Sequence, residues 1–335
     1  MAEPLVDPHG RTVRDLRISV TDRCNFRCTY CMPAEGMVWL PRQEILSFEE
    51  IERVARVAVE RFGVDGLRLT GGEPTVRAHL PVLVEKLAAL RVPGTGRKPD
   101  LSLTTNGATF RLVAEDLRAA GLDRVNISLD SLRRDRFLAI TRRDELHRVL
   151  DGIAAAKEVG FSPVKVNVVL ERGVNDDEVL DFVEFARQEA VEVRFIEFMP
   201  LDADGAWDRD RVVTQAEVLA AIEAVHPLEQ VPARGAAPAD RWRLADGSAV
   251  IGIIPSVTAP FCGNCDRVRL TAEGQFRTCL FAVEEFDLRP ILRGGGTDDD
   301  LAEAIVRAVG TKWAGHRIGQ VRFVRPAKSM SQIGG

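Results

Sequence analysis

Short apolar stretches alternate with longer amphipathic segments through the first two thirds of the chain. Six of the short stretches are rich in Val, Ile and Leu, as strands buried on both faces are. We expect strands at Leu16–Val20, Gly66–Thr70, Leu101–Thr105, Arg124–Leu129, Val164–Leu170 and Val191–Phe198. The segments that follow these strands have apolar residues at the helical period, which predicts helices at Phe48–Phe62, Leu80–Leu90, Thr109–Ala120, Leu146–Val159, Asp177–Glu189 and Gln215–Val225. Ser47 followed by Glu50 predicts a capping box at the start of the first helix.

This alternation predicts an α/β fold. Six strand–helix units joined by right-handed crossovers give a parallel sheet. The periodicity fits both a partial barrel and an open doubly wound sheet, and it does not decide between them. In either arrangement the active site lies at the carboxyl ends of the strands. Polar residues follow several expected strands there, among them Asp22, Gly71–Pro74, Asn106 and Asp130.

The sequence changes in character beyond about Val231. A loop rich in Pro, Gly and Ala is followed by short β-like pieces and one amphipathic helix. The pieces are Arg241–Leu244, Ala249–Ile254 and Val268–Thr271, and the helix is Asp298–Val309. We therefore expect two domains, a larger one at residues 1–228 and a smaller α+β domain at residues 229–335.

Composition limits the classes of function. The chain of 335 residues has a net charge of −5, so no overall positive field attracts nucleic acid. Its first residues lack the features of a signal peptide, and no apolar run is long enough to span a membrane. We expect a cytoplasmic protein with reduced cysteines and without nucleic-acid or membrane partners. An anionic ligand would need a local cluster of cations.

The 6 cysteines of the chain form two triplets, C-x3-C-x2-C directly after the first expected strand and C-x2-C-x13-C near the C-terminus. They comprise Cys24, Cys28 and Cys31, and Cys262, Cys265 and Cys279. A closed zinc site needs four protein ligands, whereas three thiolates suit a [4Fe–4S] cluster with one iron open to a small molecule. The residues alone leave open a [3Fe–4S] form, a closed electron-transfer cluster, and zinc with a distant fourth ligand such as His226 or His316.

Three cations, Arg17, Arg68 and Lys165, interrupt apolar strand patterns. A charge inside a parallel strand is costly unless a ligand or a carboxylate pairs with it. A guanidinium fork suits phosphate oxygens, so these positions favour a phosphate-bearing ligand. Internal ion pairs, for example with Glu197 or Asp130, are the alternative.

The first triplet, with Tyr30 between its last two cysteines, and Gly71-Gly72-Glu73-Pro74 after the second strand resemble the radical S-adenosylmethionine (SAM) enzymes. The resemblance implies an incomplete (βα)6 TIM-type barrel, with a [4Fe–4S] cluster on the first triplet and SAM at its open iron. Reductive cleavage of SAM then yields a 5′-deoxyadenosyl radical. The positions that match SAM-contacting residues of these enzymes are Tyr30, Gly72, Ser128 and Met199.

The second triplet narrows the resemblance. Its surroundings, Phe261–Leu270, the stretch Asp15–Cys24 and the double-glycine end make the sequence similar to the GTP 3′,8-cyclase family from Arg11 to Gly335. This similarity implies a second [4Fe–4S] cluster whose open iron binds the purine of GTP. The implied GTP contacts are Arg17, Arg68, Thr104, Lys165, Arg267, Val268 and Arg269. The implied catalytic residues are Arg17, Arg267, Arg269, Gly334 and Gly335.

The same resemblance implies a lyase of molybdenum cofactor biosynthesis. It would convert GTP, with SAM, to (8S)-3′,8-cyclo-7,8-dihydroguanosine 5′-triphosphate in the first step of that pathway. The resemblance also implies an electron donor and allows a homodimer. It implies that the product passes to cyclic pyranopterin monophosphate synthase. The alternative is another radical SAM enzyme with an auxiliary cluster, such as a peptide maturase, which would need a peptide-docking region.

Overall fold

The computed structural model describes residues 3–202, 205, 207–232, 235–318, 320 and 323–334. Its strands are β1 (Asp15–Ser19), β2 (Gly66–Thr70), β3 (Asp100–Thr105), β4 (Arg124–Ser128), β5 (Lys165–Leu170), β6 (Glu192–Glu197), β7 (Leu228–Val231), β8 (Asp240–Leu244), β9 (Val250–Ile254), β10 (Arg267–Leu270), β11 (Gln275–Arg277) and β12 (Phe286–Asp287). The first six are the strands expected from the sequence, and each observed end lies within about one residue of the expected end.

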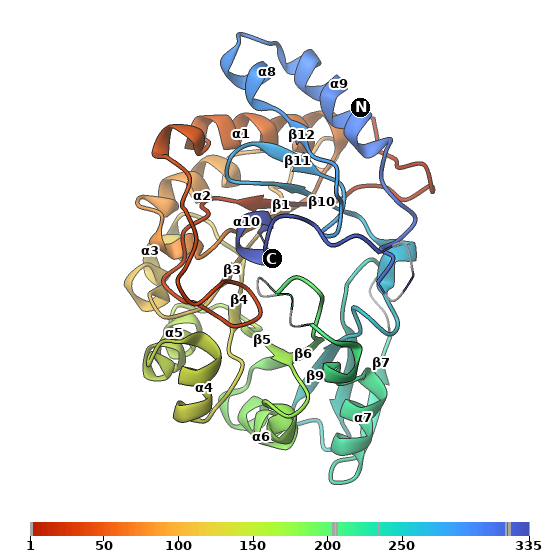
Figure 1. Cartoon of the computed structure of the whole chain (residues 1–335). Coiled ribbons are helices and arrows are strands. Elements are labelled where there is room, and N and C mark those ends of the chain that lie inside the picture. Colours follow the sequence, from red (N-terminus) through yellow and green to blue (C-terminus); the bar gives the residue numbers. More distant parts are fainter. Residues whose placement is uncertain are drawn as a thin grey trace.

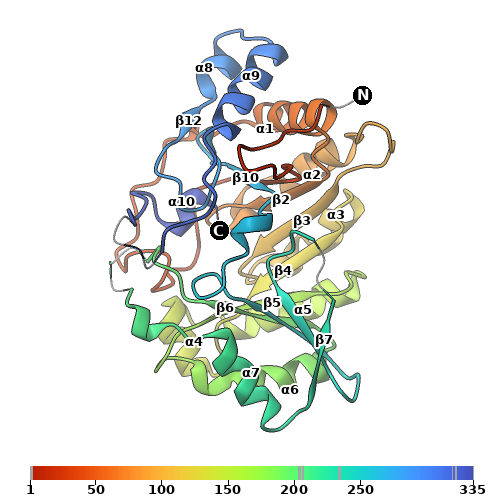
Figure 2. The ribbon, with the colours of Figure 1, turned by 90° about the vertical axis from the view of Figure 1, so that its right-hand side faces the viewer.

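Within the described residues these strands form one sheet, in the order β12-β11-β10-β1-β2-β3-β4-β5-β6-β9-β8-β7. Strands β1 to β6 pair in parallel and in sequence order. The sheet curls around a central space and carries helices on its outer side (Figure 1, Figure 2). The fold is therefore the incomplete TIM-type barrel, and the doubly wound alternative is wrong.

The C-terminal part of the chain extends this sheet at both edges. Strand β10 pairs in parallel with β1, and β9 pairs in parallel with β6. Antiparallel strands continue from each, β8 and β7 beyond β9, and β11 and β12 beyond β10. Apolar side chains from both parts of the chain pack into one core. The division into residues 1–228 and 229–335 stays a prediction.

The α-helices of the described chain are α1 (Phe48–Arg56), α2 (Leu80–Ala88), α3 (Ala114–Ala119), α4 (Arg134–Thr141), α5 (Leu146–Glu158), α6 (Val179–Glu189), α7 (Gln215–Glu223), α8 (Arg289–Arg293), α9 (Asp298–Val309) and α10 (Met330–Ile333). The first expected helix is α-helical only to Arg56 and continues as a π-helical turn, η2 (Val57–Arg61). The third divides into a 3-10 turn, η4 (Phe110–Leu112), and α3. The hydrophobic pattern did not predict α4, which buries few side chains.

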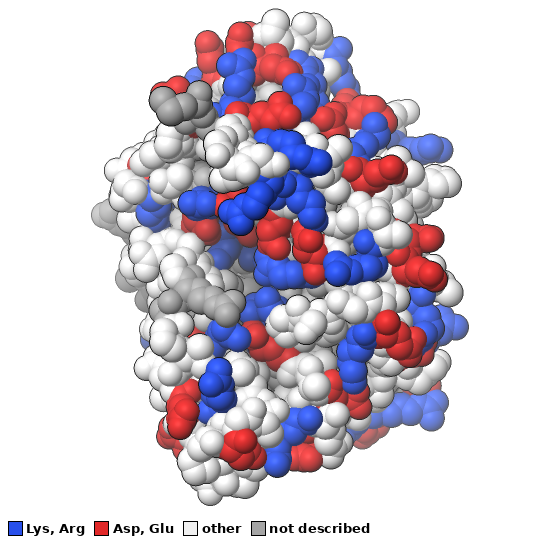
Figure 3. Space-filling view, turned by 180° about the vertical axis from the view of Figure 1, so that it is seen from behind, with Lys and Arg blue, Asp and Glu red and all other residues white. Residues whose placement is uncertain are grey.

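The outer surface carries charges of both signs. Lys and Arg side chains are interspersed with Asp and Glu over the face seen in Figure 3, in keeping with the small net charge of −5. Among the described helices, none has the length and apolar character needed to cross a membrane.

The start of α1 has the capping box that the sequence predicts. Ser47 Oγ accepts a hydrogen bond from the Glu50 N–H at 3.1 Å, and Glu50 Oε2 accepts one from the Ser47 N–H at 2.7 Å. Glu50 also accepts from Arg293 Nε at 2.6 Å. The capping box therefore ties α1 to α8 in the C-terminal part as well as starting the helix.

Replacing Ser47 with alanine removes the acceptor for the Glu50 N–H. We expect the free energy of unfolding to fall by about 1 kcal/mol, the usual cost of losing an N-cap serine. Thermal unfolding of the iron-free protein measures the change, and the control Ser47→Thr, which keeps a hydroxyl, should retain most of the stability. An unchanged melting temperature in Ser47→Ala would mean that this cap does not stabilise the fold.

Candidate functional site

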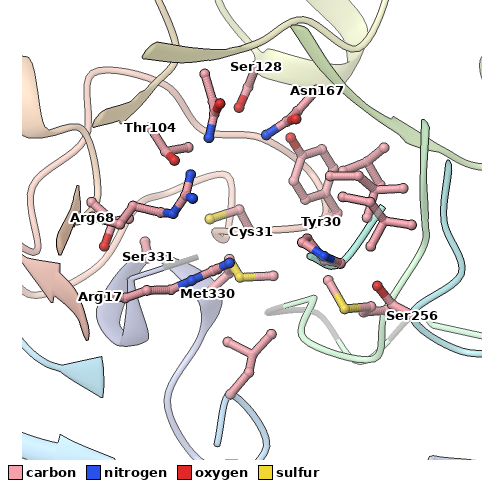
Figure 4. Close-up of a pocket in the computed structure, with 18 of the residues that line it drawn as sticks. Arg17, Tyr30, Cys31, Arg68, Thr104, Ser128, Asn167, Ser256, Met330 and Ser331 are labelled. Carbon is pink, nitrogen blue, oxygen red and sulfur yellow. The ribbon is translucent and has the colours of Figure 1, made fainter. Parts of the chain in front are cut away.

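A cavity of about 330 Å³ lies inside the barrel and extends from the loops at the carboxyl ends of the strands to Cys262 and Cys265, which precede β10. In Figure 4 the side chains of Arg17, Arg68, Cys31 and Tyr30 point into it. The predicted site residues that line it are Cys24, Cys28, Cys31, Cys262, Cys265, Cys279, Arg17, Arg68, Arg267, Arg269, Tyr30, Gly72, Thr104, Ser128 and Met199. Two cysteine triplets far apart in the sequence thus face one common space.

Three arginines form one row across the inner face of the sheet. In the parallel register, Arg17 of β1 lies opposite Arg68 of β2 on one side and Arg269 of β10 on the other. Register partners project from the same face of a sheet, so the three guanidinium groups point inward together. Burial, reinforced by the neighbouring arginines, lowers the pKa of Arg17 to about 9. Burial also lowers the pKa of Arg68 to about 10.

The carboxylates considered as internal partners for these arginines are engaged elsewhere. Glu197 accepts hydrogen bonds from the N–H groups of Val257 and Thr258, both at 2.8 Å. Asp130 accepts from the Tyr30 hydroxyl at 2.6 Å. The alternative of internal ion pairs with these two acids is therefore not observed.

Asp15 is the acid that reaches the arginine row. Its Oδ1 forms an ion pair with Arg17 Nε at 3.7 Å, which is too long for a hydrogen bond. The Nε atoms of Arg17 and Arg68 are buried without a hydrogen-bond partner. Since buried donors are normally satisfied, these N–H groups indicate a site for anionic oxygens.

The first triplet lies in the loop after β1, and its thiols form no disulfide. Burial raises the pKa of Cys24 to about 11, that of Cys31 to about 12, and that of Cys28 well above its usual value. Cys24 Sγ accepts from the Phe26 N–H at 3.3 Å and from Asn106 Nδ2 at 3.9 Å. Buried thiols ionise when a metal replaces their protons, so these cysteines suit metal ligation.

The residues fit an iron–sulfur cluster better than a zinc ion. Among the described residues, no three His, Cys, Asp or Glu side chains converge as ligands of a single metal ion. His226 lies outside the cavity lining. Both ring nitrogens of His316 are engaged, Nε2 with the Ser256 carbonyl at 2.8 Å and Nδ1 with the Ile318 N–H at 3.4 Å. Neither histidine is placed as a fourth zinc ligand.

Two cysteines of the second triplet precede β10, and the third follows β11. Cys262 is in the 3-10 turn η7 (Phe261–Asn264), Cys265 follows this turn, and Cys279 follows β11. Burial raises the pKa of Cys262, and the backbone N–H of His316 donates to its thiol. Strand β10 begins just after Cys265, so Arg267 and Arg269 on its inner face follow this triplet closely in the sequence.

Gly71 and Gly72 allow the loop after β2 to lie directly against the loop after β1. A Cβ on Gly71 would be 2.5 Å from the Thr21 carbonyl oxygen, and one on Gly72 would be 2.3 Å from the Arg23 carbonyl oxygen. The Gly72 N–H already donates to Thr21 at 2.8 Å. The carbonyl of Gly72 is therefore the group that can accept from a ligand's ammonium.

Glu73 fixes the neighbouring loop. Its carboxylate accepts from Thr105 Oγ1 at 2.7 Å and from the Asn106 N–H at 2.6 Å. Burial raises the pKa of Glu73. Asn106 in turn donates to Cys24, so Glu73 positions a hydrogen-bond donor to the first triplet.

Two predicted residues lie on the strands but not on the cavity wall. Lys165 is buried on the inner face beside its register partner Asn126, and burial lowers its pKa to about 7, with Arg194 as the next cause. Val268 alternates with the two arginines of β10, so its side chain points to the opposite face, into the hydrophobic core.

Helix α10 lies near the centre of the molecule (Figure 1, Figure 2), and its residues Met330 and Ser331 line the cavity. Ser331 donates to the thiol of Cys31. The carbonyl of Gly334 accepts a hydrogen bond from Arg269 Nη1. Gly334 therefore contacts the arginine row without lining the cavity, whereas Gly335 lies outside the described residues.

Several polar residues of the cavity wall were not predicted from the sequence, including Asn126, Asn167 and Arg194. Asn167 lies opposite Ser128 and Arg194 in the register, and its Oδ1 is buried without a hydrogen-bond partner. All three interrupt otherwise apolar strands, as Arg17 does. The signal that identified Arg17 was thus present at these positions too.

Comparisons with known proteins cover the whole chain. Residues 18–186 match the Radical SAM superfamily, and residues 191–318 match Molybdenum Cofactor Synthesis C. A protein named GTP 3′,8-cyclase from Streptomyces coelicolor is 49% identical to this chain, and the match covers 100% of this chain and 97% of the relative. A protein of the same name from Mycobacterium sp. (strain KMS) is 50% identical, and the match covers 99% of this chain and 94% of the relative. The crystal structure of Streptococcus suis SuiB bound to S-adenosylmethionine superimposes on this chain with a TM-score of 0.58 and 13% sequence identity. The match covers 81% of this chain and 62% of the SuiB chain, and it shows that the two share a fold.

Gly72→Ala should disrupt the contact between the first two loops, because the new Cβ would meet backbone atoms that cannot rotate away. We expect SAM to bind at least about tenfold more weakly, as misplacement of a positioning group commonly causes. Equilibrium binding of SAM to the reconstituted protein measures this. Gly66→Ala is the control, because Gly66 lies away from the cavity wall and its added Cβ would come no closer than 3.4 Å to another atom. Equal SAM affinity in the native protein and Gly72→Ala would refute the role of the close approach.

Proposed function

The chain belongs to the GTP 3′,8-cyclase family of the radical SAM superfamily, and we propose that its two cysteine triplets hold SAM and GTP within one cavity. Its reaction is the SAM-dependent radical cyclisation of GTP to (8S)-3′,8-cyclo-7,8-dihydroguanosine 5′-triphosphate, the first step of molybdenum cofactor biosynthesis. The observation that carries the proposal is that both triplets and the arginine row line the same space. The full-length relatives favour this reaction over the peptide-maturase alternative.

SAM and an iron–sulfur cluster are the cofactors of this enzyme. We place the cluster on Cys24, Cys28 and Cys31, which are half-buried thiols of one loop, and Cys24 accepts a hydrogen bond from the Phe26 N–H. When bound, the cluster and SAM supply a 5′-deoxyadenosyl radical that takes a hydrogen atom from ribose C3′ of GTP. The chain's own part is positioning, which can supply much of the rate of such a step.

The SAM contacts that we propose are Tyr30, Gly72, Ser128 and Met199, all of which line the cavity. The Gly72 carbonyl can accept from the SAM ammonium, because the Gly72 N–H is bonded within the protein. The Tyr30 ring is oriented by its hydrogen bond to Asp130, whose pKa burial raises to about 6. An aromatic face at this point can pack against the adenine.

We propose a second [4Fe–4S] cluster on Cys262, Cys265 and Cys279, with the purine of GTP at its open iron. The GTP contacts that we propose are Arg17, Arg68, Thr104, Lys165, Arg267, Val268 and Arg269. The arginines supply cations for the triphosphate, and Val268 provides backbone between two of them. Anchoring GTP at both its base and its phosphates would hold the ribose toward the SAM site and keep it from rotating.

The catalytic residues that we propose are Arg17, Arg267, Arg269, Gly334 and Gly335. Arg269 Nη1 donates to the Gly334 carbonyl, so the end of the chain supports one member of the arginine row. A Cβ on Gly334 would be 2.6 Å from Thr70 Oγ1, which explains the need for glycine there.

The partners beyond GTP follow from the chemistry of the reaction. An electron donor must reach the first cluster, and the exposed Arg23 and Arg143 beside its loop favour an acidic protein. The cyclised triphosphate is the substrate expected for cyclic pyranopterin monophosphate synthase, to which we propose it passes. The family resemblance allows a homodimer, and we propose a location in the cytoplasm, where reducing conditions preserve cluster thiolates.

Anaerobic incubation with SAM, GTP and dithionite tests the proposed roles of the two triplets. The product is an isomer of GTP, because an electron and a proton replace the hydrogen atom lost from C3′, so chromatography coupled to mass spectrometry must resolve it. We expect Cys262→Ser to cleave SAM but to form no cyclised nucleotide. The matched variant Cys24→Ser should form neither 5′-deoxyadenosine nor product. Undiminished product from Cys262→Ser would contradict the assignment of the second triplet.

Lys165 gives the proposed GTP site a specific pH dependence. Its pKa of about 7 in the free protein should rise when a triphosphate binds nearby, because the anion stabilises the ammonium. GTP binding should then take up a proton above about pH 7, and affinity should fall by at most about tenfold for each further pH unit. Below that pH the lysine is already charged, so the affinity should level off.

Calorimetric titration with GTP at about pH 8, in two buffers of different ionisation enthalpy, measures the proton uptake that accompanies GTP binding. We expect heats that differ between the buffers for the native protein and differ less for Lys165→Met. The half-buried Lys98, which pairs with Asp123 at 2.6 Å, offers the control Lys98→Met. Equal heats in both buffers for the native protein would exclude Lys165 from the GTP site.

A further inference from the structure

Lys312 is a buried lysine beside the second cysteine triplet. It follows α9 and is only 3% exposed. Its Nζ donates to the Thr278 carbonyl at 2.9 Å, to the Arg267 carbonyl, and to Cys265 Sγ at 3.8 Å. One ammonium group therefore contacts the residue before Cys279 as well as Cys265 itself.

No carboxylate within the described residues forms an ion pair with Lys312, and Asp266, which does interact with its charge, lies beyond ion-pair distance. Two other buried or half-buried cations of the C-terminal part are paired, since Arg277 contacts Glu285 and Lys328 contacts Glu273 and Glu285. A buried ammonium that has only neutral acceptors is costly. A negative charge on one of its direct acceptors would stabilise the ammonium further.

In the proposed second cluster, Cys265 would supply this charge as a thiolate. A cysteine that ligates iron is deprotonated, and a cluster with three thiolates becomes more negative when it is reduced. A fixed cation in contact with a ligand sulfur stabilises the reduced form more than the oxidised form, because the Coulomb energy grows with the charge. Hydrogen bonds and charges at the ligand sulfurs are known determinants of cluster potential.

We propose that Lys312 is a positioning residue of the second cluster, where its ammonium holds Cys265 and raises the cluster's reduction potential. This inference rests on the second cluster of the proposed function. It assigns to Lys312 an electrostatic role that a purely structural brace would not have.

Arg11 shows what a structural brace at the same triplet looks like. It donates from Nη1 to the Cys262 carbonyl at 2.6 Å, and its Nε pairs with Asp7 Oδ2 at 2.6 Å. Its charge is therefore compensated within the protein, and it contacts a carbonyl rather than a ligand sulfur. Lys312 differs from Arg11 in both respects.

The test uses the full-length chain with Cys24, Cys28 and Cys31 replaced by alanine, so that any cluster signal comes from the second triplet. After anaerobic reconstitution, iron content is measured and the cluster is titrated while its electron paramagnetic resonance signal is followed. We expect Lys312→Gln, which keeps a donor but loses the charge, to lower the midpoint potential. Lys312→Met should lower it further, and Lys98→Gln, remote from the cavity, should leave it unchanged.

A cluster of unchanged potential in both Lys312→Gln and Lys312→Met would overturn the proposal while leaving the second cluster established. Failure of the background variant to bind iron would overturn the second cluster and the role of Lys312 with it. If Lys312→Gln binds no iron, Lys312→Arg decides the matter. Iron binding at near-native potential in Lys312→Arg supports the role of the charge, and loss of iron in both variants reduces Lys312 to a structural brace.

Discussion

The in-register pairing of β10, β1 and β2 brings Arg269, Arg17 and Arg68 side by side, and the architecture of the site depends on this row. A TIM-type barrel normally fills its interior with layers of apolar side chains. Here one layer is replaced by like charges whose burial lowers the pKa of each. Desolvation and mutual repulsion oppose closing this interior into a dry core, and an anion that enters it relieves both. The centre of the barrel is therefore a binding cavity.

Apolar side chains on the other face of the same strands offset the free-energy cost of burying these arginines. Leu16 and Ile18 alternate with Arg17, face the helices and are fully buried, and Leu67 and Leu69 flank Arg68 in the same way. Each fully buried side chain of this kind contributes about 1.5–3 kcal/mol relative to an exposed one. The fold is thus stabilised on the helix side of the sheet, which leaves the inner side free to carry charge and function.

Much of this arrangement could be read from the sequence, for identifiable reasons. Strands buried on both faces give continuous apolar runs, so their positions were predicted closely, and a charge such as Arg17 inside a run was conspicuous. The pairing of β10 with β1 was not predictable in this way, because it joins residues about 250 positions apart and leaves no local pattern. Lys165 was predicted on the right strand, but its distance from the cavity wall depends on side-chain packing. Lys312 has no conspicuous pattern around it, since a lysine at the end of a helix is normally exposed.

The long-range pairing also determines how the two halves of the site are held together. Cys24 follows β1 and Cys265 precedes β10, so the backbone hydrogen bonds between adjacent strands connect the two triplets. The C-terminal helix adds a second connection, because Ser331 donates to Cys31 and Gly334 accepts from Arg269. Loops alone would leave the distance between two bound reactants variable. A strand pair and a helix that contacts both sides fix it, which is what an oriented transfer of a hydrogen atom requires.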